Sequence, residues 1–488
     1  MAKLNITPRC VIVKGNFDVL HPGHIRLLSF ARSCGDKLIV AVNTDKAMAI
    51  KSRIDENHRL EMISSLECVD AAFLTSKSSV EIVKKYKPYA VVKGKEFEAR
   101  ENPEMEALST YGGKLIFGSG EFESIAEQYL QKATKLGINF DFSEAKAFAQ
   151  RHNITSEALN KLITNFTKLK VLVIGEVIVD EYIHGNAVGM SQEDPTIVIT
   201  PHRVEKFLGG AAITAGHLKA MGASQVSLVS VIGNDEAGVY AKEKISNYHV
   251  DANLLLDNTR PTPLKTRYRA SKKTLLRVNQ VRQHKISKEL QSKILKKLES
   301  IIPSLDLFVF SDFNYGLLPQ ALVESITHRC KQYNVKMVAD SQTSSQIGDI
   351  SRYCGMDLIT PTEREARVAL NNPDDGLVIL AHKLTNRSTP KNLVITLGEE
   401  GIFIHIPKEN KEDWENDRLP AFNRNATDSA GAGDCFLSAS SLSLAINASP
   451  WEAFYLGSLA AACQVDSLGN TPLSYQVLKQ AISESFKI

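Results

Sequence analysis

In the first quarter of the chain, short apolar runs alternate with stretches of helical periodicity. Between two of these runs, "HIRLLSFARSCG" places Ile25, Leu28 and Ala31 on one face of a helix. Strands and helices that alternate in this way form βαβ units around a parallel sheet, with phosphate ligands at the carboxyl ends of the strands. We therefore expect an α/β domain over residues 1–136. The strands predicted for it are 10–15, 37–43, 71–75, 89–94 and 113–118.

A polar stretch at 137–168 separates this pattern from a second one. In it Leu159, Ile163 and Phe166 recur at helical spacing after Thr155 and Ser156. Ser and Thr before such a run are typical of a helix start. We therefore expect a helical connector here rather than a disordered linker.

The second alternating pattern predicts a larger α/β domain over residues 169–488. It ends in helices of small residues around "GAGDCFLSASSLSLA". Two further stretches, 197–207 and 262–279, alternate like exposed strands and predict a small antiparallel β flap beside the main sheet. The main-sheet strands predicted for this domain are 170–182, 225–235, 305–312, 335–340, 356–360, 392–398 and 401–406.

The composition is that of a soluble globular protein of more than one domain. The chain has 488 residues, of which 43% are hydrophobic and 23% charged, and its formal net charge is +3. This near balance gives no reason to expect nucleic acid or an anionic membrane as a partner. The seven cysteines are scattered without a C-x-x-C pair, as in a reducing compartment. No run approaches the ~18 apolar residues of a membrane span, so we expect a cytoplasmic protein.

The stretch "VKGNFDVLHPGH" carries the first candidate chemistry. A short strand and Gly15 lead into His21-Pro22-Gly23-His24 at a helix start, where free amides attract phosphate. Two imidazoles three residues apart can donate hydrogen bonds to charge that develops on a phosphoryl group. This chemistry suits nucleotidyl transfer, in which a phosphorylated acceptor attacks the α-phosphorus of an NTP. The alternative is a helix cap with two incidental histidines; zinc is disfavoured because no third ligand is evident.

"GNFDVLHPGH" resembles the signature G-x-F-D-x-x-H-x-G-H of cytidylyltransferase-like nucleotidyltransferases, and "GDKLIVAVNTD" and "YAVVKG" continue the likeness. The resemblance implies a Rossmann-like nucleotidyltransferase domain in which His21 and His24 stabilise the transition state. The family usually closes its site with a Ser-Thr-Thr segment, whereas this chain has Ser124-Ile125-Ala126 and lacks two of the hydroxyls. The three basic side chains among the implied residues are equally well explained as solvated surface groups. The implied nucleotide-binding residues are Gly15, Phe17, Lys51, Arg59, Lys93 and Ser124.

The second candidate chemistry lies in "TDSAGAGDCFLSAS", where Gly431, Ala432 and Gly433 precede Asp434. Glycines let the backbone approach a phosphate closely, and their amides form an anion hole. A carboxylate beside that hole can take a proton from an alcohol, which suits in-line transfer of a γ-phosphoryl group to a hydroxyl. The alternative is a tight helix–strand contact with Asp434 as a cap. The chain has no G-x-x-x-x-G-K-[ST] motif, which disfavours a P-loop kinase.

This segment resembles the D-[ST]-x-G-A-G-D signature of ribokinase-like sugar kinases, and the likeness spans about 168–488. It implies Asp434 as the catalytic base, ATP as the phosphoryl donor and Mg²⁺ as the cofactor, with Glu365 near the metal through water. The family pattern is changed at Glu176, Ile213 and Thr362, which leaves the identity of the sugar open. The implied nucleotide-binding residues are Thr396, Gly398, Gly401, Gly431, Ala432 and Gly433, and the implied substrate-binding residues are Asp180, Gly209 and Gly210. The segment "SDFNYG" at 311–316 resembles the corresponding segment of heptose kinases, which implies that Asp312 also contacts substrate.

The flap carries a basic face. Lys265, Arg267 and Arg269 alternate along one predicted strand, and Arg277 follows on the next. Such a face could bind a sugar that is already phosphorylated. The alternative is an ordinary solvated strand face.

A sugar kinase joined to a nucleotidyltransferase resembles the bifunctional enzymes that activate heptose, although those place the kinase first. The resemblance implies an ATP-dependent kinase acting on O1 of heptose 7-phosphate and a transferase that converts a sugar 1-phosphate and an NTP into a nucleotide sugar. It also implies small-molecule partners and a homo-oligomer, a dimer through the kinase flap. Two alternatives stay open: a sugar kinase with an inactive N-terminal domain that binds nucleotide or mediates assembly, and a structural or regulatory protein.

Overall fold

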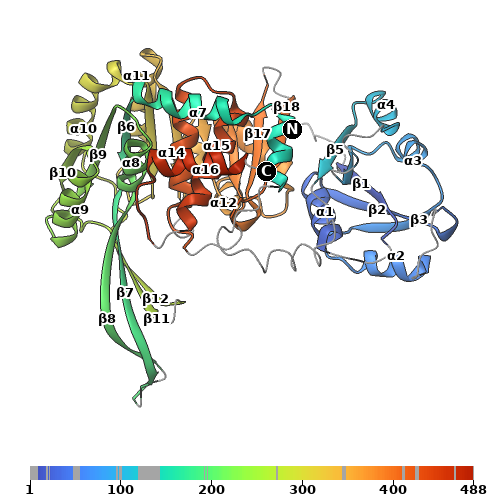
Figure 1. The fold of residues 1–488 in the computed structure, drawn as a ribbon, viewed down its shortest axis with the longest axis horizontal. Helices are drawn as coiled ribbons and strands as arrows, with labels where there is room; N and C mark the ends of the chain where they lie inside the picture. The colour runs from blue at the N-terminus through green and yellow to red at the C-terminus, as the bar shows by residue number, and fades with distance from the viewer. Residues whose placement is uncertain are drawn as a thin grey trace, which may run out of the picture. The chain divides into compact units, whose positions relative to one another are not determined.

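The computed structural model divides the chain into two compact units, one comprising Met1–Ile138 with Asn372–Lys383, the other Asn139–Asn371 with Leu384–Ile488. The ribbon of each is drawn in Figure 1. The structure describes residues 9–17, 20, 22–47, 55–94, 97, 102–118, 143–191, 193–194, 196–270, 273–342, 348–408, 413–423, 428–466 and 469–486.

The first unit contains a five-stranded, wholly parallel sheet in the order β3-β2-β1-β4-β5. Apolar residues of β1 and β2 are buried on both faces, as helices on each side of a parallel sheet require. The strand order reverses between β1 and β4, which is where such sheets bind ligands. The elements are β1 (Cys10–Gly15), α1 (Pro22–Ser33), β2 (Lys37–Asn43), α2 (Glu56–Ser64), β3 (Ala71–Thr75), α3 (Ser79–Tyr86), β4 (Ala90–Gly94), α4 (Glu104–Ser109) and β5 (Lys114–Gly118).

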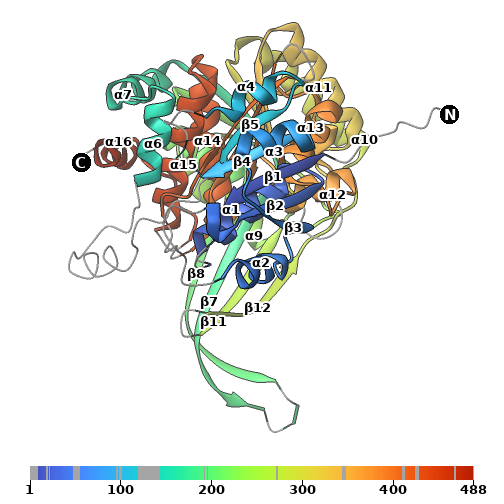
Figure 2. The same ribbon diagram turned by 90° about the vertical axis from the view of Figure 1, so that its right-hand side faces the viewer.

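The second unit contains a nine-stranded sheet in the order β10-β9-β6-β13-β14-β15-β16-β17-β18, parallel except for its last two pairings. Figures 1 and 2 show helices on both faces of this sheet. Its strands are β6 (Lys170–Gly175), β9 (Gln225–Ile232), β10 (Asp251–Leu256), β13 (Leu307–Asp312), β14 (Lys336–Ser341), β15 (Leu358–Ile359), β16 (Leu393–Thr396), β17 (Ile402–Pro407) and β18 (Trp414–Leu419). The helices over 211–485 are α8 (Ala211–Ala220), α9 (Glu236–Asn247), α10 (Lys288–Ile301), α11 (Gln320–Gln332), α12 (Glu363–Leu370), α13 (Leu377–Ser388, divided between the units at Lys383), α14 (Ala432–Ala445), α15 (Pro450–Val465) and α16 (Tyr475–Ser485).

The stretch predicted as a connector is helical, but it does more than connect. It forms α6 (Ser143–Arg151), α7 (Ser156–Asn165) and a short 3₁₀ turn, Phe166–Lys168. Phe148, Leu159 and Phe166 are fully buried in one core with β6, α8, α14 and α15. The apolar periodicity thus reflects packing within the second unit, because an isolated helix of this length would be marginal in water.

The flap has four strands in the order β12-β11-β7-β8, namely β7 (Val177–Met190), β8 (Ile197–Gly210), β11 (Leu264–Ala270) and β12 (Lys273–Gln280). Figures 1 and 2 show β7 and β8 extending far beyond the main sheet. Two expectations were wrong. Residues 170–182 are not one strand, because the chain leaves the main sheet at Glu176. The flap is also not wholly antiparallel, since β7 and β11 pair in parallel.

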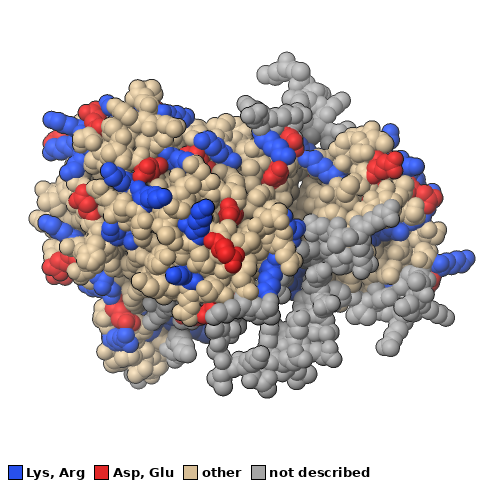
Figure 3. Space-filling view, turned by 45° about the horizontal axis from the view of Figure 1, so that its top comes forward, with Lys and Arg blue, Asp and Glu red and all other residues tan. Residues whose placement is uncertain are grey.

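The surface agrees with the balanced composition. Figure 3 shows Lys and Arg interspersed with Asp and Glu on the face that it presents. Within the described part of the chain, no helix is both long and apolar enough to cross a bilayer.

Candidate functional site

The candidate base of the second unit stands at a helix start. Gly431 has φ +77°, a left-handed conformation that glycine adopts without strain, and α14 begins at the next residue. The first amides of α14 have no partner within the helix and can bind an anion. Asp434 lies in this first turn and is 5% exposed. Burial raises the pKa of its carboxyl to about 7, although a hydrogen bond from Thr214 and the charge of Lys265 oppose that rise.

Thr214 connects the candidate base to the Gly-Gly loop. Its hydroxyl donates to Asp434 Oδ1 at 3.0 Å and lies 3.2 Å from the carbonyl oxygen of Gly210. Gly210 has φ +62° and precedes α8, and a methyl group built there would lie 2.3 Å from the carbonyl oxygen of Glu176. The backbone therefore requires glycine at this position. Sequence reasoning singled out the loop but not Thr214.

Asp180 faces the same loop from β7. It is 5% exposed and forms an ion pair with Arg267 of β11. A methyl group built on Gly209 would lie only 2.5 Å from Asp180 Oδ2, so glycine is needed for this close approach. The structure thus brings together four residues that the sequence predicted separately: Asp434, Asp180, Gly209 and Arg267.

Lys265 and Arg267 do not form a solvated strand face. The ammonium of Lys265 lies 4.8 Å from the ring centre of Phe313 and 5.8 Å from that of Tyr315. Burial lowers its pKa, while the charge of Asp180 opposes the shift. Arg267 lies 5.1 Å from the ring of Tyr182. The two cations are therefore held by aromatic and acidic neighbours.

The remaining two basic flap residues lie differently. Arg269 lies 5.5 Å from the ring centre of Tyr182, beside Arg267. Arg277 pairs in register with Arg267 on β12, a strand whose residues are all exposed. Solvent exposure makes Arg277 the most accessible cation of the predicted face.

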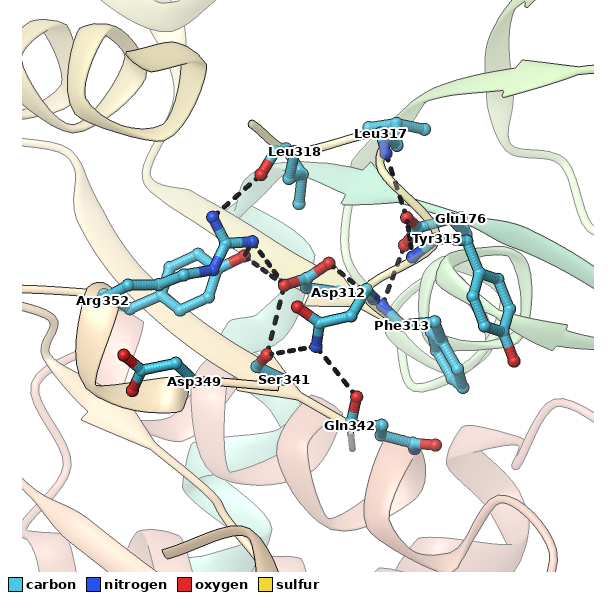
Figure 4. Close-up of polar contacts among 12 residues, drawn as sticks. Glu176, Asp312, Phe313, Tyr315, Leu317, Leu318, Ser341, Gln342, Asp349 and Arg352 are labelled. Atoms are coloured by element: carbon cyan, nitrogen blue, oxygen red, sulfur yellow. Dashed lines mark hydrogen bonds and ion pairs between the residues drawn. The ribbon is translucent and has the colours of Figure 1, made fainter. Parts of the chain in front are cut away.

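Asp312 is held within a separate polar network, drawn in Figure 4. Its Oδ2 accepts hydrogen bonds from Arg352 at 2.5 Å, Tyr353 at 2.9 Å and Ser341 at 3.1 Å, and its Oδ1 accepts from the amide of Asn314 at 2.9 Å. The residue is 1% exposed. These contacts occupy the carboxylate that the resemblance places on substrate, so in this structure Asp312 anchors its loop.

Glu176 anchors the other side of that loop. Its carboxylate accepts hydrogen bonds from the amides of Phe313 at 2.8 Å, Tyr315 at 3.0 Å and Leu317 at 3.2 Å (Figure 4). Burial and the nearby charge of Asp312 raise its pKa to about 7, although these amides favour the charged form. The rings that contact Lys265 belong to the same loop, so Glu176 acts on the site through the loop.

Asp340 and Glu365 form an acidic group beside the candidate base. Asp340 is the penultimate residue of β14, and burial together with the charges of Glu365 and Asp434 raises its pKa well above the ordinary value. Oxygen ligands with excess negative charge suit Mg²⁺, so these residues fit the ion that the kinase family implies. Glu365 also caps α12 through the Thr362 amide at 2.8 Å. Among the described residues no three acidic, histidine or cysteine side chains gather to hold a metal ion, so water and phosphate would complete its coordination.

The predicted nucleotide turn follows β16. Thr396 forms an isolated parallel bridge with Thr362, which brings the turn beside the start of α12. Gly398 and Gly401 both have positive φ, and a methyl group on Gly401 would lie 2.1 Å from the carbonyl oxygen of Leu419. The glycines here are therefore required by the turn itself.

In the first unit, His24 lies near the start of α1. The ring centre of Phe17 lies 5.1 Å away in an edge-to-face arrangement. Phe17 is 2% exposed and has φ +52°, an uncommon conformation for a bulky residue. A methyl group built on Gly15 would lie 3.0 Å from the Phe17 ring. Gly15 and Phe17 thus form a packed support for His24, whereas His21 lies outside the described residues.

Of the three cations predicted to bind nucleotide in this unit, the two that the structure describes are engaged within the protein. Arg59 is fully buried and donates to the carbonyl oxygens of Asn16 at 2.6 Å and Asn43 at 2.9 Å. It thereby fixes the loops that follow β1 and β2. Lys93 pairs with buried Glu104 at 2.6 Å. Neither behaves as a solvated surface group, while Lys51 and the Ser124-Ile125-Ala126 segment lie outside the described residues.

The sequence analysis did not identify Asp428 and Asp340 as candidate functional residues, although the positions of both in the chain indicated it. Asp428 begins the "DSAGAGD" segment, and its carboxylate accepts hydrogen bonds from the amides of Ala430 and Gly469, both at 3.1 Å. Asp340 ends a predicted strand at the carboxyl edge of a parallel sheet, which is where ligands bind. Their positions in the chain could have identified both.

Comparisons with known proteins identify the families that the two regions resemble. A family model described as "pfkB family carbohydrate kinase" matches residues 168–475, and one described as "Cytidylyltransferase-like" matches residues 12–112. "Bifunctional protein HldE" of Desulfatibacillum aliphaticivorans is 31% identical over 326 residues, which are 66% of this chain and 65% of that protein. The protein of the same name from Helicobacter hepaticus is 29% identical over 320 residues, 64% of each. The chain therefore spans slightly less than two thirds of the length of these relatives.

Solved structures share the fold of the second unit. Phosphofructokinase-2 from Escherichia coli, in complex with substrates and products, superposes with a TM-score of 0.54 at 14% identity, covering 65% of this chain and 100% of that one. Ribokinase from Giardia lamblia gives a TM-score of 0.53 at 18% identity, with 64% and 99% coverage. Since the kinase model matches well over half of its residues, the chain belongs to the pfkB family of carbohydrate kinases, with a cytidylyltransferase-like region preceding the kinase region.

Proposed function

We propose that the chain is a bifunctional sugar-activating enzyme. Its second unit transfers the γ-phosphoryl group of ATP to a sugar hydroxyl, and its first unit transfers a nucleotidyl group from an NTP to a sugar 1-phosphate. The observation that carries the proposal is Asp434, a buried carboxylate with a pKa raised to about 7, at a helix start and close to Asp180 and Lys265. A base with this pKa can remove a proton from an alcohol near neutral pH.

In the kinase step, Asp434 takes the proton of the acceptor hydroxyl while that oxygen attacks the γ-phosphorus in line. The amides of Gly433 and Asp434 at the start of α14 donate to the oxygens of the transferring group. Asp180 orients a sugar hydroxyl, and Lys265 offsets the negative charge nearby. Mg²⁺, held through Glu365 and Asp340, would neutralise the charge of the ATP phosphates when bound. Thr396, Gly398 and Gly401 would line the nucleotide.

The acceptor that we propose is heptose 7-phosphate, phosphorylated at O1. The relatives reported above carry the name of a bifunctional protein, and the chain resembles enzymes with D-glycero-β-D-manno-heptose 7-phosphate kinase and heptose 1-phosphate adenylyltransferase activities. Exposed Arg277 and the neighbouring Arg267 suit the phosphate that this sugar already carries. The product of the first unit would then be an ADP-heptose-like nucleotide sugar.

In the nucleotidyl transfer step, His24 and His21 would donate to the α-phosphoryl oxygens while pyrophosphate leaves. Arg59 would act by fixing the loops beside the nucleotide, since its guanidinium is already occupied by carbonyl oxygens. A kinase with an inert first unit is the second candidate, because Ile125 and Ala126 stand where the family has two hydroxyls.

We also propose that the chain dimerises through the flap. Five apolar side chains on its two longest strands are exposed: Val188, Met190, Ile197, Val198 and Val204. A group of exposed apolar side chains on neighbouring strands is typical of a surface that a partner or another element covers. Sedimentation of the chain and of a V188D/V204D variant tests this, with dissociation expected for the variant.

The function is tested by ³¹P NMR with Mg-ATP and heptose 7-phosphate, and separately with heptose 1-phosphate and ATP or CTP. We expect an anomeric phosphate in the first reaction and pyrophosphate in the second. A kinase signal without pyrophosphate would favour the kinase-only alternative. Absence of both signals would contradict the proposed substrate.

A further inference from the structure

Asn470 is a buried amide whose Oδ1 has no hydrogen-bond partner among the described residues. It is 5% exposed, and its Oδ1 is closed off from solvent with no donor within reach among the described residues. Buried polar side chains are nearly always paired in native proteins, so a buried amide with an unpaired oxygen calls for an explanation. Asn470 belongs to none of the motifs recognised in the sequence.

The amide lies between the two glycine loops of the kinase site. A methyl group built on Gly431 would lie 2.2 Å from Asn470 Oδ1. A methyl group built on Gly209 would lie 3.7 Å from Asn470 Nδ2 and 2.5 Å from Asp180 Oδ2. An amide donor and a carboxylate acceptor therefore approach one point above Gly209, beside the loop that leads to Asp434.

The backbone at Asn470 is held firmly. The amide of Gly469 donates to Asp428 Oδ2 at 3.1 Å, and Gln464 Nε2 donates to the carbonyl oxygen of Gly469 at 3.1 Å. Gly469 has φ +74°, and a methyl group there would lie 2.6 Å from the ring of Phe207. The Asn470 side chain is thus presented from a fixed position, as a preorganised binding group requires.

We propose that Asn470 binds a hydroxyl group of the sugar acceptor, next to Asp180. One hydroxyl can donate its proton to Asp180 Oδ2 and accept a hydrogen bond from Asn470 Nδ2 at the same time. This inference rests on the proposed kinase function and adds a specificity-determining residue to it. A site built to pair with a hydroxyl discriminates strongly against an analogue that lacks it, because its buried polar groups are then left unpaired.

The test compares the full-length chain with an N470A variant in kinase assays with heptose 7-phosphate and Mg-ATP. We expect kcat/KM for the sugar to fall about tenfold or more and KM for ATP to stay within about twofold. Monodeoxy analogues of the sugar then locate the contact. One analogue should cost the wild type as much as N470A costs on the parent sugar, and N470A should lose little further on that analogue.

Asn392 offers a matched control. It is also a buried amide with an unpaired Oδ1, but it donates to the carbonyl oxygen of Asp357 and precedes β16 at the amino end of the strand. N392A should therefore lower thermal stability without changing KM for either substrate. This separates loss of an amide in the site from loss of a buried amide elsewhere.

Unchanged sugar kinetics in N470A, or a rise in KM for ATP alone, would overturn the inference. If the wild type phosphorylates no sugar, the proposed function fails, and calorimetry with heptose 7-phosphate decides the question for Asn470. Binding that N470A weakens about tenfold would still support the contact. Equal binding to both proteins, or binding to neither, would overturn it.

Discussion

The Tyr182 hydroxyl donates to Asp428 Oδ2 across 3.1 Å and joins the flap to the glycine loop. The positions of Tyr182 and Asp428 in their elements explain this contact. Tyr182 follows Asp180 by two residues on β7, so one strand face presents both side chains. Asp428 also accepts from the Ala430 and Gly469 amides. The position of the flap and the shape of the loop before Asp434 are therefore linked by one carboxylate.

Replacing Tyr182 by Phe should lower kinase turnover while preserving the fold. The ring keeps its contacts with Phe207 and Arg267, and only the bond to Asp428 is lost. A hydrogen bond to a charged group contributes about 1.5–3 kcal/mol, so we expect kcat/KM to fall about tenfold. Tyr240→Phe is the control, because that hydroxyl donates to the Lys206 carbonyl oxygen at 2.5 Å instead. Equal rates in both variants would show that the flap and the loop are independent.

Asp434→Asn should abolish sugar phosphorylation and leave nucleotidyl transfer unchanged. A general base contributes about 10²–10⁴-fold, and Asn cannot accept the proton. The pH profile of the wild type provides a second measurement. With its pKa near 7, Asp434 is protonated and inactive at lower pH, so kcat/KM should rise tenfold per pH unit below about 7 and then level off. A flat profile between pH 5 and 8 would assign the base to another group.

Glu176→Gln should reduce the pH dependence of stability. The pKa of Glu176 is raised from 4.5 to about 7 in the folded protein, so the folded state binds more protons than the unfolded state between these values. Stability contributed by this group is therefore present at low pH and is lost as pH rises through about 7. Denaturation from pH 4.5 to 8 should show a shallower decline for the variant. Glu289→Gln is the control, because Glu289 forms an exposed ion pair with Lys293 on α10. If stability falls with pH at the same slope in the wild type and in Glu176→Gln, the assignment is contradicted.

The strands and the glycine loops were predictable because each depends on a few consecutive residues. The runs at 10–15, 37–43 and 71–75 form β1, β2 and β3 with the predicted bounds. The break at Glu176 was not predictable, since "VLVIGEVIVDEY" is apolar on both sides of it. Its cause is long-range, because the buried Glu176 carboxylate accepts hydrogen bonds from the amides of a loop that begins 137 residues further along the chain.

The side chains of the site also include some that the sequence predicted and others whose contacts it did not. Asp434, Asp180 and Lys265 could be named from motifs and alternation, and they do lie near one another. The occupation of Asp312 by Arg352 and Tyr353, residues 40 and 41 positions away, could not be read from its motif. The same holds for Phe148, whose helix resembled a connector until its burial against the kinase core was seen. Tertiary contacts decided each of these cases.

The last prediction concerns the first unit. His24→Ala should abolish nucleotidyl transfer and leave sugar phosphorylation at the wild-type rate, the reverse of Asp434→Asn. Removal of one donor to a developing oxyanion costs about 10²–10³-fold, and Ala donates nothing.

Phe17→Leu tests the contact that supports His24, and its expected effect is smaller. Leu keeps an apolar side chain beside His24 but loses the edge-to-face contact of 5.1 Å between the rings, and such a ring pair contributes about 0.5–1.5 kcal/mol. We therefore expect a partial loss of about three- to tenfold, measured as pyrophosphate release from heptose 1-phosphate and ATP. If His24→Ala releases pyrophosphate as fast as the wild type, His24 is a helix residue without a role in catalysis. If neither protein releases any while both phosphorylate sugar, the first unit serves only in binding or assembly.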